Sequence, residues 1–459
     1  MNLPINKNKI IFAVIGVLAL IALIYLVSLM NGATKKSKVP QKTTSSNFSI
    51  WIVEDEKEKF TEILKKFKDK NKAYTNINFV VENFSDYEEY FYTLQSAIIA
   101  GKEPDVFMLN NNEKSGLEEQ VSGLDPAIVN AQNFRKEFKT FFGEDLIRTT
   151  SIKNPDDPEK EEIVEFLAGI PLGYETLGIF YNRRYIESKD VASWASISDA
   201  TKQLKETNSD IIPLALGNGS TVPYSYDILT QFFMLDDIVS FEKAEGNKMK
   251  QGLTTYLLYG DVEGNNAYNT RFADLISSGK NAIDLFSKEE VAMLIGYPRM
   301  LNDIDKKGFK KTFLMASPFP HYFIGNGKSL VNYNYFVINK NTKNYNLAND
   351  FLAYLISEEG QNAYLDAYPY YLPAMVKLEE KRLEKKVNTN FNIALKDFMD
   401  KEFIFSSFDK GLKAMYDKEI TNILDDETNA TNSFERLKNV LLCKYNKMVK
   451  FEKLSTVCK

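Results

Sequence analysis

The sequence contains very little histidine and cysteine: one histidine, His321, and two cysteines, Cys443 and Cys458. These residue types supply most zinc ligands in proteins, so the usual Cys/His metal sites are excluded. Histidine is also the commonest general acid or base in enzymes, and its scarcity counts against a catalytic function. We predict a protein that is not an enzyme, with no catalytic residue, no metal site and no cofactor. Whether the two cysteines form a disulfide bond stays open.

The chain also lacks an excess of positive charge. It has 57 Lys and Arg residues against 62 Asp and Glu residues, a net charge of −5. Nucleic-acid-binding proteins usually concentrate positive charge, so we predict no nucleic-acid partner. At 459 residues the chain exceeds what one hydrophobic core usually supports, and two domains are expected.

One stretch near the N-terminus has no charged residue. Residues 10–30, IIFAVIGVLALIALIYLVSLM, would span about 31 Å as a helix, close to the hydrocarbon thickness of a membrane. A secretory signal would have a shorter apolar core and a cleavage site of small residues, which Asn31-Gly32-Ala33 matches poorly. We predict that residues 1–30 form an uncleaved membrane anchor, a single transmembrane helix.

The segment after this anchor, residues 31–47, has no apolar periodicity and is predicted to be a flexible tether. Its lysines outnumber those before the apolar stretch, which opposes the positive-inside rule. The orientation of the anchor therefore stays open on charge alone.

From Phe48 onward, short apolar strands alternate with amphipathic helices. Strands are predicted at 48–53, 77–84 and 106–109, with helices after the first two. Asp55 and Glu58 resemble a capping box at the start of the first helix. The alternation predicts a parallel α/β sheet, in which ligands lie at the carboxyl ends of the strands. Those ends carry polar side chains, namely Glu54, Asp55, Asn110, Asn111 and Asn112.

Residues 168–186, AGIPLGYETLGIFYNRRYI, are predicted to form a strand, a break and a second strand. Such a segment can pass in extended form from one lobe to another and present Tyr174 and Glu175 between the lobes. One more buried strand of a single large sheet is the alternative. A second crossing is predicted at 315–320, within FLMASPFP.

The rest of the globular part continues the α/β pattern. A helix is predicted at 194–205, and a strand followed by a glycine-rich turn at 211–220. In 282–300 we expect a helix beginning at Ser287 and then a buried strand, AMLIG. A strand at 329–339 and a helix at 348–360 follow.

Five blocks of the sequence, in this order, resemble the family 1 extracellular solute-binding proteins, the maltose-binding-protein-like receptors of ABC importers. The blocks are the strand and helix that open with SIW, AIIAGKEPDVFML, AGIPLGYETLGIFYN with its following tryptophan-containing helix, LFSKEEVAMLIG, and SLVNYNYFVINKNTKNYNLANDFLAYLISEEGQNAY. The resemblance covers residues 48–442. The lipid-anchoring cysteine of the family is absent, which fits an anchor helix in its place.

The resemblance implies a two-lobed, periplasmic-binding-protein-like α/β fold with a hinge between the lobes. The first lobe would contain residues 48–170 and 322–368, and the second 171–321 and 369–459. A ligand bound in the cleft between them would favour closure by hinge bending.

The resemblance also implies which residues contact the ligand. Carried over position by position, they are Glu54, Asp55, Asn110, Asn111, Asn112, Tyr174, Glu175, Asn218, Tyr224, Tyr297 and Arg299. The family often has tryptophan where this chain has Leu109 and Tyr297, which weakens the correspondence there. Each residue has a structural alternative: Asp55 could be a helix cap, and the three asparagines could form a turn.

The function implied is a membrane-tethered, extracytoplasmic receptor that delivers a small ligand, a sugar or oligosaccharide, to an ABC transporter permease. Its globular part would lie outside the cytoplasm on a single-pass anchor in the cell membrane. A ligand-sensing receptor for a signalling partner is an alternative. An exported carbohydrate-active hydrolase is another, with Glu54 and Glu175 flanking one bond. Peptides, polyamines and anions stay open as ligands.

Overall fold

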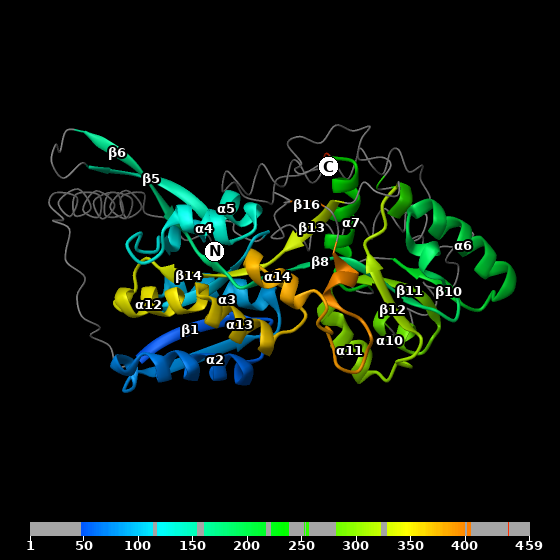
Figure 1. Cartoon of the computed structure of the whole chain (residues 1–459), viewed down its shortest axis with the longest axis horizontal. Coiled ribbons are helices and arrows are strands. Elements are labelled where there is room, and N and C mark those ends of the chain that lie inside the picture. Colours follow the sequence, from blue (N-terminus) through cyan, green and yellow to red (C-terminus); the bar gives the residue numbers. More distant parts are fainter. Residues whose placement is uncertain are drawn as a thin grey trace, which may run out of the picture. The chain divides into compact units, whose positions relative to one another are not determined.

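The computed structural model describes residues 47–112, 117–153, 160–216, 222–237, 252, 254–256, 281–322, 328–399, 402–404 and 439. These residues belong to one compact unit, Ser45–Lys459, whose elements are labelled in Figure 1. The predicted anchor, the predicted tether up to residue 46, Asn218 and both cysteines lie outside the described residues. Among the helices of the described ranges, none is long and apolar enough to cross a membrane.

The first sheet has the strand order β2-β1-β3-β14-β4, and a short strand, β7, pairs with β14. The strands are β1 (Asn47–Val53), β2 (Asn78–Phe84), β3 (Val106–Asn110), β4 (Val121–Ser122), β7 (Ile170–Pro171) and β14 (Asn334–Asn339). As predicted, β1 runs parallel to both β2 and β3. β14 comes from much later in the chain and is antiparallel to β3.

The helices near this sheet bury several aromatic side chains against it. They are α2 (Lys57–Lys70), α3 (Tyr87–Ile99), α12 (Tyr345–Ile356) and α13 (Glu358–Ala367). Helix α2 buries Phe60, Ile63, Leu64 and Phe67, the four residues of its predicted apolar face. The Phe351 ring of α12 lies 5.3 Å from the Phe67 ring and 6.3 Å from that of Phe48, centroid to centroid. Such edge-to-face contacts join the later helix to the first sheet.

The predicted capping box at the first helix is wrong. The residue before α2 is Glu56, and no side chain caps the helix there. The Asp55 carboxylate instead accepts a hydrogen bond from the Tyr364 hydroxyl, at 2.8 Å. Asp55 therefore bonds to a residue 309 positions away in the sequence instead of capping the adjacent helix.

The second sheet has the order β10-β11-β9-β12. Its strands are β9 (Gly178–Asn182), β10 (Ile212–Ala215), β11 (Val291–Gly296) and β12 (Leu314–Pro318), and the nearby helices are α6 (Trp194–Thr207), α7 (Ser225–Leu235), α10 (Ala282–Ser287) and α11 (Leu301–Lys306). The buried strand predicted from AMLIG is confirmed as β11. The helix expected to begin at Ser287 is wrong, because α10 ends there. Its start is fixed by the Asn281 side chain, which accepts the Asp284 N–H at 2.9 Å.

The strands of a third sheet come from separate parts of the sequence. Its order is β15-β8-β13-β16, with β8 (Gly173–Thr176), β13 (Lys328–Asn332), β15 (Leu372–Pro373) and β16 (Glu402–Ile404). The chain passes from β7 in the first sheet through β8 in the third to β9 in the second. The crossing predicted in 168–186 is therefore confirmed, and a single large sheet is excluded.

The second crossing falls only partly on the predicted residues. Residues 315–318 do not cross, because they belong to β12, which pairs with β9 along its whole length within the second sheet. The passage back runs through β13 and β14, which belong to the third and first sheets. β12 is an edge strand, where Pro318 is tolerated because no ladder N–H is required of it. An edge strand that ends in proline and an extended crossing have the same sequence pattern.

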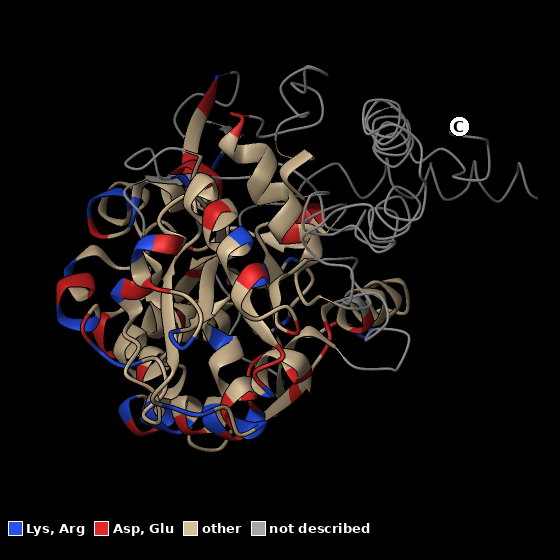
Figure 2. Cartoon of the chain, turned by 90° about the vertical axis from the view of Figure 1, so that its right-hand side faces the viewer, with Lys and Arg blue, Asp and Glu red and all other residues tan. Residues whose placement is uncertain are grey.

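The remaining described elements surround these sheets. They are the hairpin of β5 (Ile147–Lys153) and β6 (Glu161–Leu167), the helices α4 (Ala131–Glu137), α5 (Thr140–Leu146) and α14 (Val376–Arg382), and the 3₁₀ turns Lys72–Tyr74, Glu118–Gln120, Ser188–Val191, Pro298–Met300 and Leu395–Phe398. Figure 2 shows that Lys and Arg positions (blue) and Asp and Glu positions (red) alternate along the described part of the chain.

Candidate functional site

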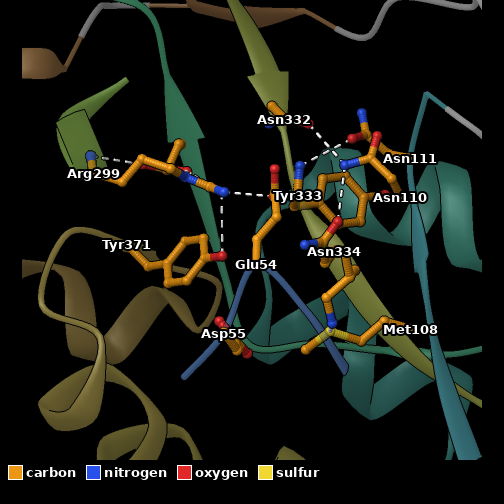
Figure 3. Close-up of polar contacts among 12 residues, drawn as sticks. Glu54, Asp55, Met108, Asn110, Asn111, Arg299, Asn332, Tyr333, Asn334 and Tyr371 are labelled. Atoms are coloured by element: carbon orange, nitrogen blue, oxygen red, sulfur yellow. Dashed lines mark hydrogen bonds and ion pairs between the residues drawn. The ribbon is translucent and has the colours of Figure 1, made fainter. Parts of the chain in front are cut away.

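Three residues in or just after strands form a buried ionic network centred on Arg299. Arg299 lies just after β11, Glu54 just after β1, and Glu175 within β8. The Arg299 Nε donates to Glu175 Oε2 at 2.5 Å, and its backbone N–H donates to Glu175 Oε1 at 3.1 Å. A terminal nitrogen, Nη1, donates to Glu54 Oε2 at 2.5 Å (Figure 3).

The network joins all three sheets through one guanidinium group. Its other terminal nitrogen, Nη2, forms an ion pair with Glu175 and donates to the Tyr371 hydroxyl at 3.3 Å. The rings of Tyr370 and Tyr371 lie 5.8 and 5.6 Å from the guanidinium carbon, close enough for cation–π attraction. Glu175 is fully buried, whereas the Glu54 side chain is 27% exposed.

Burial and charge act in opposite directions on these groups. Burial raises the pKa of Glu175, and the neighbouring Arg299 charge opposes that rise. Burial lowers the pKa of Arg299, but the carboxylates of Glu175 and Glu54 outweigh it and leave that pKa well above its ordinary value. Arg299 is therefore a permanent positive charge held by two carboxylates.

The backbone at Glu54 has an uncommon conformation. Its φ of 63° is in the left-handed region, which is uncommon for a residue with a side chain. The Glu54 N–H donates to the carbonyl of Phe84, at the end of β2, at 2.9 Å. This bend ends β1 and turns the chain toward α2. Backbone strain of this kind is found most often at functional sites.

Asp55 lies beside the network among tyrosines. Its Oδ2 accepts the Tyr364 hydroxyl, and within the described residues its buried Oδ1 has no hydrogen-bond partner. Burial raises the pKa of Asp55 to about 7, while the Tyr364 hydrogen bond and the Arg299 charge work against the rise. The rings of the neighbouring tyrosines contact one another: Tyr364 and Tyr371 are stacked with centroids 5.6 Å apart, and Tyr370 is tilted against Tyr371 with centroids 4.8 Å apart.

The three asparagines after β3 are held by other parts of the protein. Asn110 Nδ2 donates to the side-chain oxygens of Asn332 and Asn334, each at 2.9 Å. Asn111 accepts the Tyr333 N–H at 2.9 Å and donates to the Val331 carbonyl at 2.9 Å.

Through these bonds the segment braces the passage from β13 to β14 (Figure 3). Asn112 is also buried, and its side-chain oxygen accepts from Asn111 Nδ2 at 3.2 Å.

Tyr224 and Tyr297 form an edge-to-face pair with ring centroids 4.8 Å apart. Tyr224 precedes α7 with a φ of 61°, and Tyr297 precedes Arg299. The Tyr297 hydroxyl is buried and has no partner among the described residues. Tyr174 points elsewhere: its ring packs edge-on against Phe141 and Phe142, as alternation along β8 from Glu175 requires.

The structure thus brings together Glu54, Asp55, Glu175 and Arg299, with the Tyr224–Tyr297 pair coupled electrostatically to them. It separates Tyr174 from this group, and the predicted Asn218 lies outside the described residues. Tyr364, Tyr370, Tyr371, Asn332 and Asn334 were not predicted as site residues. The repeated tyrosines of 364–371 were the available signal. In the described part of the chain, no group of three or more His, Cys, Asp or Glu residues is arranged to hold a metal ion.

Comparison with known proteins gives a consistent result. The model of a family described as bacterial extracellular solute-binding protein matches residues 62–392. A search of curated protein sequences found no match. The structure resembles an ABC substrate-binding protein from Listeria monocytogenes in complex with cycloalternan, with a TM-score of 0.65 and 14% identity over 87% of this chain and 99% of that one.

It also resembles the GacH receptor of Streptomyces glaucescens, solved unliganded and with acarbose or an acarbose homolog. The TM-score is 0.64 and the identity 15%, over 89% of this chain and 99% of that one. At such identities the likeness shows the fold alone, a two-lobed α/β solute-binding fold. The resemblance inferred from the five sequence blocks is confirmed.

Proposed function

Since the chain belongs to the family of bacterial extracellular solute-binding proteins, we propose that it captures a sugar or oligosaccharide between its lobes and delivers it to an ABC transporter permease. The observation that carries the proposal is the network of Glu54, Glu175 and Arg299, which gathers polar groups from all three sheets at one place. The two similar structures, with cycloalternan and with acarbose, have carbohydrate-like ligands in the same fold.

The chemistry of the neighbourhood suits a saccharide. Carboxylates and amides accept and donate hydrogen bonds to hydroxyl groups, and aromatic faces pack on the apolar C–H faces of sugar rings. Tyr224, Tyr297 and Tyr371 supply such rings next to the ionic network. In the proposal, Glu54, Asp55 and Asn110–Asn112 act from the first lobe, and Glu175, Tyr224, Tyr297 and Arg299 from the crossing and the second lobe.

The proposal includes the lobes and the anchor expected from the sequence. The lobes are residues 48–170 with 322–368 and residues 171–321 with 369–459. Residues 1–30 would tether the receptor to the cell membrane, with the lobes on the extracytoplasmic side. Bending at the two crossings would close the lobes over the ligand.

Hydrolysis is the less suitable alternative. A glycosidase needs two carboxyl groups in different protonation states on either side of the scissile bond. Here Glu54 and Glu175 both neutralise the same guanidinium. The family and the similar structures are binding proteins, not enzymes.

A thermal-shift screen of the full-length chain tests the proposal. The detergent should lack a sugar headgroup, and the panel should contain oligosaccharides, polyamines, peptides and oxyanions. A ligand at a hundred times its Kd stabilises the folded state by about 2.7 kcal/mol, which gives a readily measured shift. We expect a shift with at least one saccharide.

Two variants make the screen specific to the site. Glu175→Gln should abolish the shift, and Glu165→Gln, which changes an exposed carboxylate paired with Arg135, should retain it. Circular dichroism establishes that each variant is folded. Shifts only with polyamines, peptides or oxyanions would overturn the carbohydrate assignment.

A further inference from the structure

Helix α3 exposes a side that carries no charge. Residues 90–101, YFYTLQSAIIAG, contain no charged residue, although 26% of the chain is charged. Tyr90 is fully buried, whereas Tyr92 and Ile99 are 60% and 88% exposed. Ser96 is also exposed and lies four residues after Tyr92 and three before Ile99, so these three side chains share one side of the helix. The side of α3 that faces solvent is therefore uncharged and partly apolar.

The edge strand β2 continues this uncharged side. Its Phe84 ring packs against the Tyr90 ring of α3, with centroids 5.2 Å apart. Side chains an even number of residues apart along a strand lie on the same face, so Val80 is on the α3 side of the sheet, together with the exposed Glu82. Val80 is 37% exposed, and it and the two α3 side chains are three of the six large hydrophobic residues exposed in the described part of the chain. We call Val80, Tyr92, Ser96 and Ile99 the α3 face.

One end of the α3 face lies at the edge of the sheet where β1 begins. Helix α3 runs from the end of β2 to the start of β3, and both strands are parallel to β1. The loop after the helix is bonded at this edge: the Asp105 N–H donates to the Ser49 carbonyl at 3.0 Å, and the Asp105 carboxylate accepts the Ser49 N–H at 2.9 Å. Ile99 precedes Asp105 by only six positions, and Asn47, the first described residue, precedes Ser49 by two. The chain before Asn47 is thus attached at the edge near Ile99.

This attachment limits how far the edge can lie from a membrane. In the proposed function residues 1–30 anchor the chain, and only the sixteen residues 31–46 separate them from β1. Sixteen residues reach about 55 Å at most when fully extended. They include four lysines and no acidic residue, so an anionic membrane surface would attract them and reduce that distance.

We infer that the α3 face contacts the lipid surface of the membrane that anchors the chain, with Tyr92 and Ile99 at the level of the headgroups. Tyrosine is enriched at that level because its ring is apolar and its hydroxyl is polar. An isoleucine gains by leaving water, and an uncharged helix side has no ionised group to desolvate there. The inference rests on the proposed membrane anchor and adds a second, non-covalent contact to it.

This contact would orient the candidate ligand site. Glu54 follows the last residue of β1, and Asn110 is the last residue of β3. Both therefore lie at the edge of the sheet opposite to Ile99. Contact through the Ile99 end of α3 leaves the ligand side of the sheet turned away from the membrane, where solutes arrive.

Quenching of a tryptophan by brominated lipid tests the inference. The full-length chain is reconstituted into nanodiscs of phosphatidylcholine and phosphatidylglycerol, with or without bromine on the acyl chains close to the headgroups. Ile99→Trp reports contact with the lipid. Ile163→Trp is the matched control, because Ile163 is 78% exposed on β6 and the substitution is the same. The native Trp51 and Trp194 are 7% and 5% exposed, and their emission is subtracted with the wild-type protein.

We expect brominated lipid to reduce the emission of Ile99→Trp about twofold or more and that of Ile163→Trp by less than about a tenth. Adding Tyr92→Asp to Ile99→Trp should restore most of the emission, because it places a charge where the α3 face meets apolar lipid. Thr149→Asp introduces the same charge at an exposed position of β5 and should restore none.

The possible failures are distinguishable. If the chain separates from the nanodiscs once detergent is removed, the anchor of the proposed function fails and the inference falls with it. If the chain stays in the nanodiscs but Ile99→Trp is quenched no more than Ile163→Trp, the α3 contact is wrong and the anchor stands. Quenching that persists after Tyr92→Asp would also overturn the contact. A second copy of the chain on the α3 face would leave the emission unquenched, since only the lipid carries bromine, and would equally contradict the inference.

Discussion

At the scale of single residues, Asp55 shows how a distant contact changes the role of a local motif. Its spacing to Glu58 matches a capping box, yet its partner is Tyr364 on α13. The hydrogen bond withdraws the carboxylate from the helix terminus and places it 98% buried beside a second carboxylate, that of Glu54. Burial of a charged carboxylate is unfavourable, and the pKa of Asp55 is raised as a result.

Asp55 should make the protein less stable as the pH rises toward neutrality. Its pKa is 3.8 when exposed and about 7 in the folded protein. Because the folded state holds the proton more tightly, the contribution is favourable at low pH and is lost between about pH 4 and pH 7. The loss corresponds to at most about 4 kcal/mol at 1.36 kcal/mol per pKa unit.

The substitution Asp55→Asn keeps an acceptor for Tyr364 and removes the titration. Thermal unfolding of the ligand-free protein should show the variant gaining stability relative to wild type as the pH rises from 5 to 8. A difference between the two proteins that does not vary with pH would contradict the assigned pKa.

At the scale of elements, the sequence was most informative where periodicity was long. The apolar face of α2, the buried strand β11 and the passage in 168–186 follow from spacing and composition alone. Short segments were ambiguous for physical reasons. Helix α10 has only six residues, too few to show a helical period in the sequence. Strand β12 ends in a proline, which is tolerated equally in an edge strand and in an extended crossing.

Some residues of the candidate site could likewise be predicted from the sequence, and others could not. Glu54 and Glu175 were predictable because each follows or belongs to a recognisable strand, and Arg299 because it lies next to a block that resembles the family. The direct ionic contact among these three residues could not be predicted, because it depends on how the three sheets approach one another. Asn332 and Asn334 were not predicted, because the sequence indicated one continuous strand over 329–339. In the structure this strand is interrupted at Tyr333: Asn332 is the last residue of β13 and Asn334 the first of β14.

This junction provides a test of Asn111 as a structural brace. Its side chain bonds the Tyr333 N–H and the Val331 carbonyl, and its own N–H donates to the Tyr333 carbonyl at 3.0 Å. Asn111→Ala removes a hydrogen bond from each of two buried backbone groups, which should cost about 1–3 kcal/mol in urea unfolding. Asn133→Ala, at an exposed position in α4, should change stability by less than about 0.5 kcal/mol. Equal effects of the two substitutions would show that the brace contributes nothing.

At the scale of the whole molecule, the Arg299 network connects the parts that hinge bending would separate. Glu54 follows a strand of the first sheet and Arg299 a strand of the second, so their ion pair joins the proposed lobes directly. Glu175 lies on β8, in the crossing, and holds the guanidinium from the hinge side. The pair therefore favours closely approached lobes without any ligand.

Weakening this pair should shift the ligand-free protein toward a more open form. Arg299 and Glu54 are 14% and 27% exposed, so their interaction should exceed that of a surface pair and reach about 1–2 kcal/mol. A loss of 1.4 kcal/mol changes the ratio of closed to open forms about tenfold. Glu54→Gln preserves the size of the side chain and removes its charge. Small-angle scattering of ligand-free protein should then give a larger radius of gyration for Glu54→Gln than for wild type, with Glu165→Gln as the unchanged control. Identical scattering from all three proteins would mean that the pair does not influence lobe closure, and that Glu54 acts only as a group for the ligand.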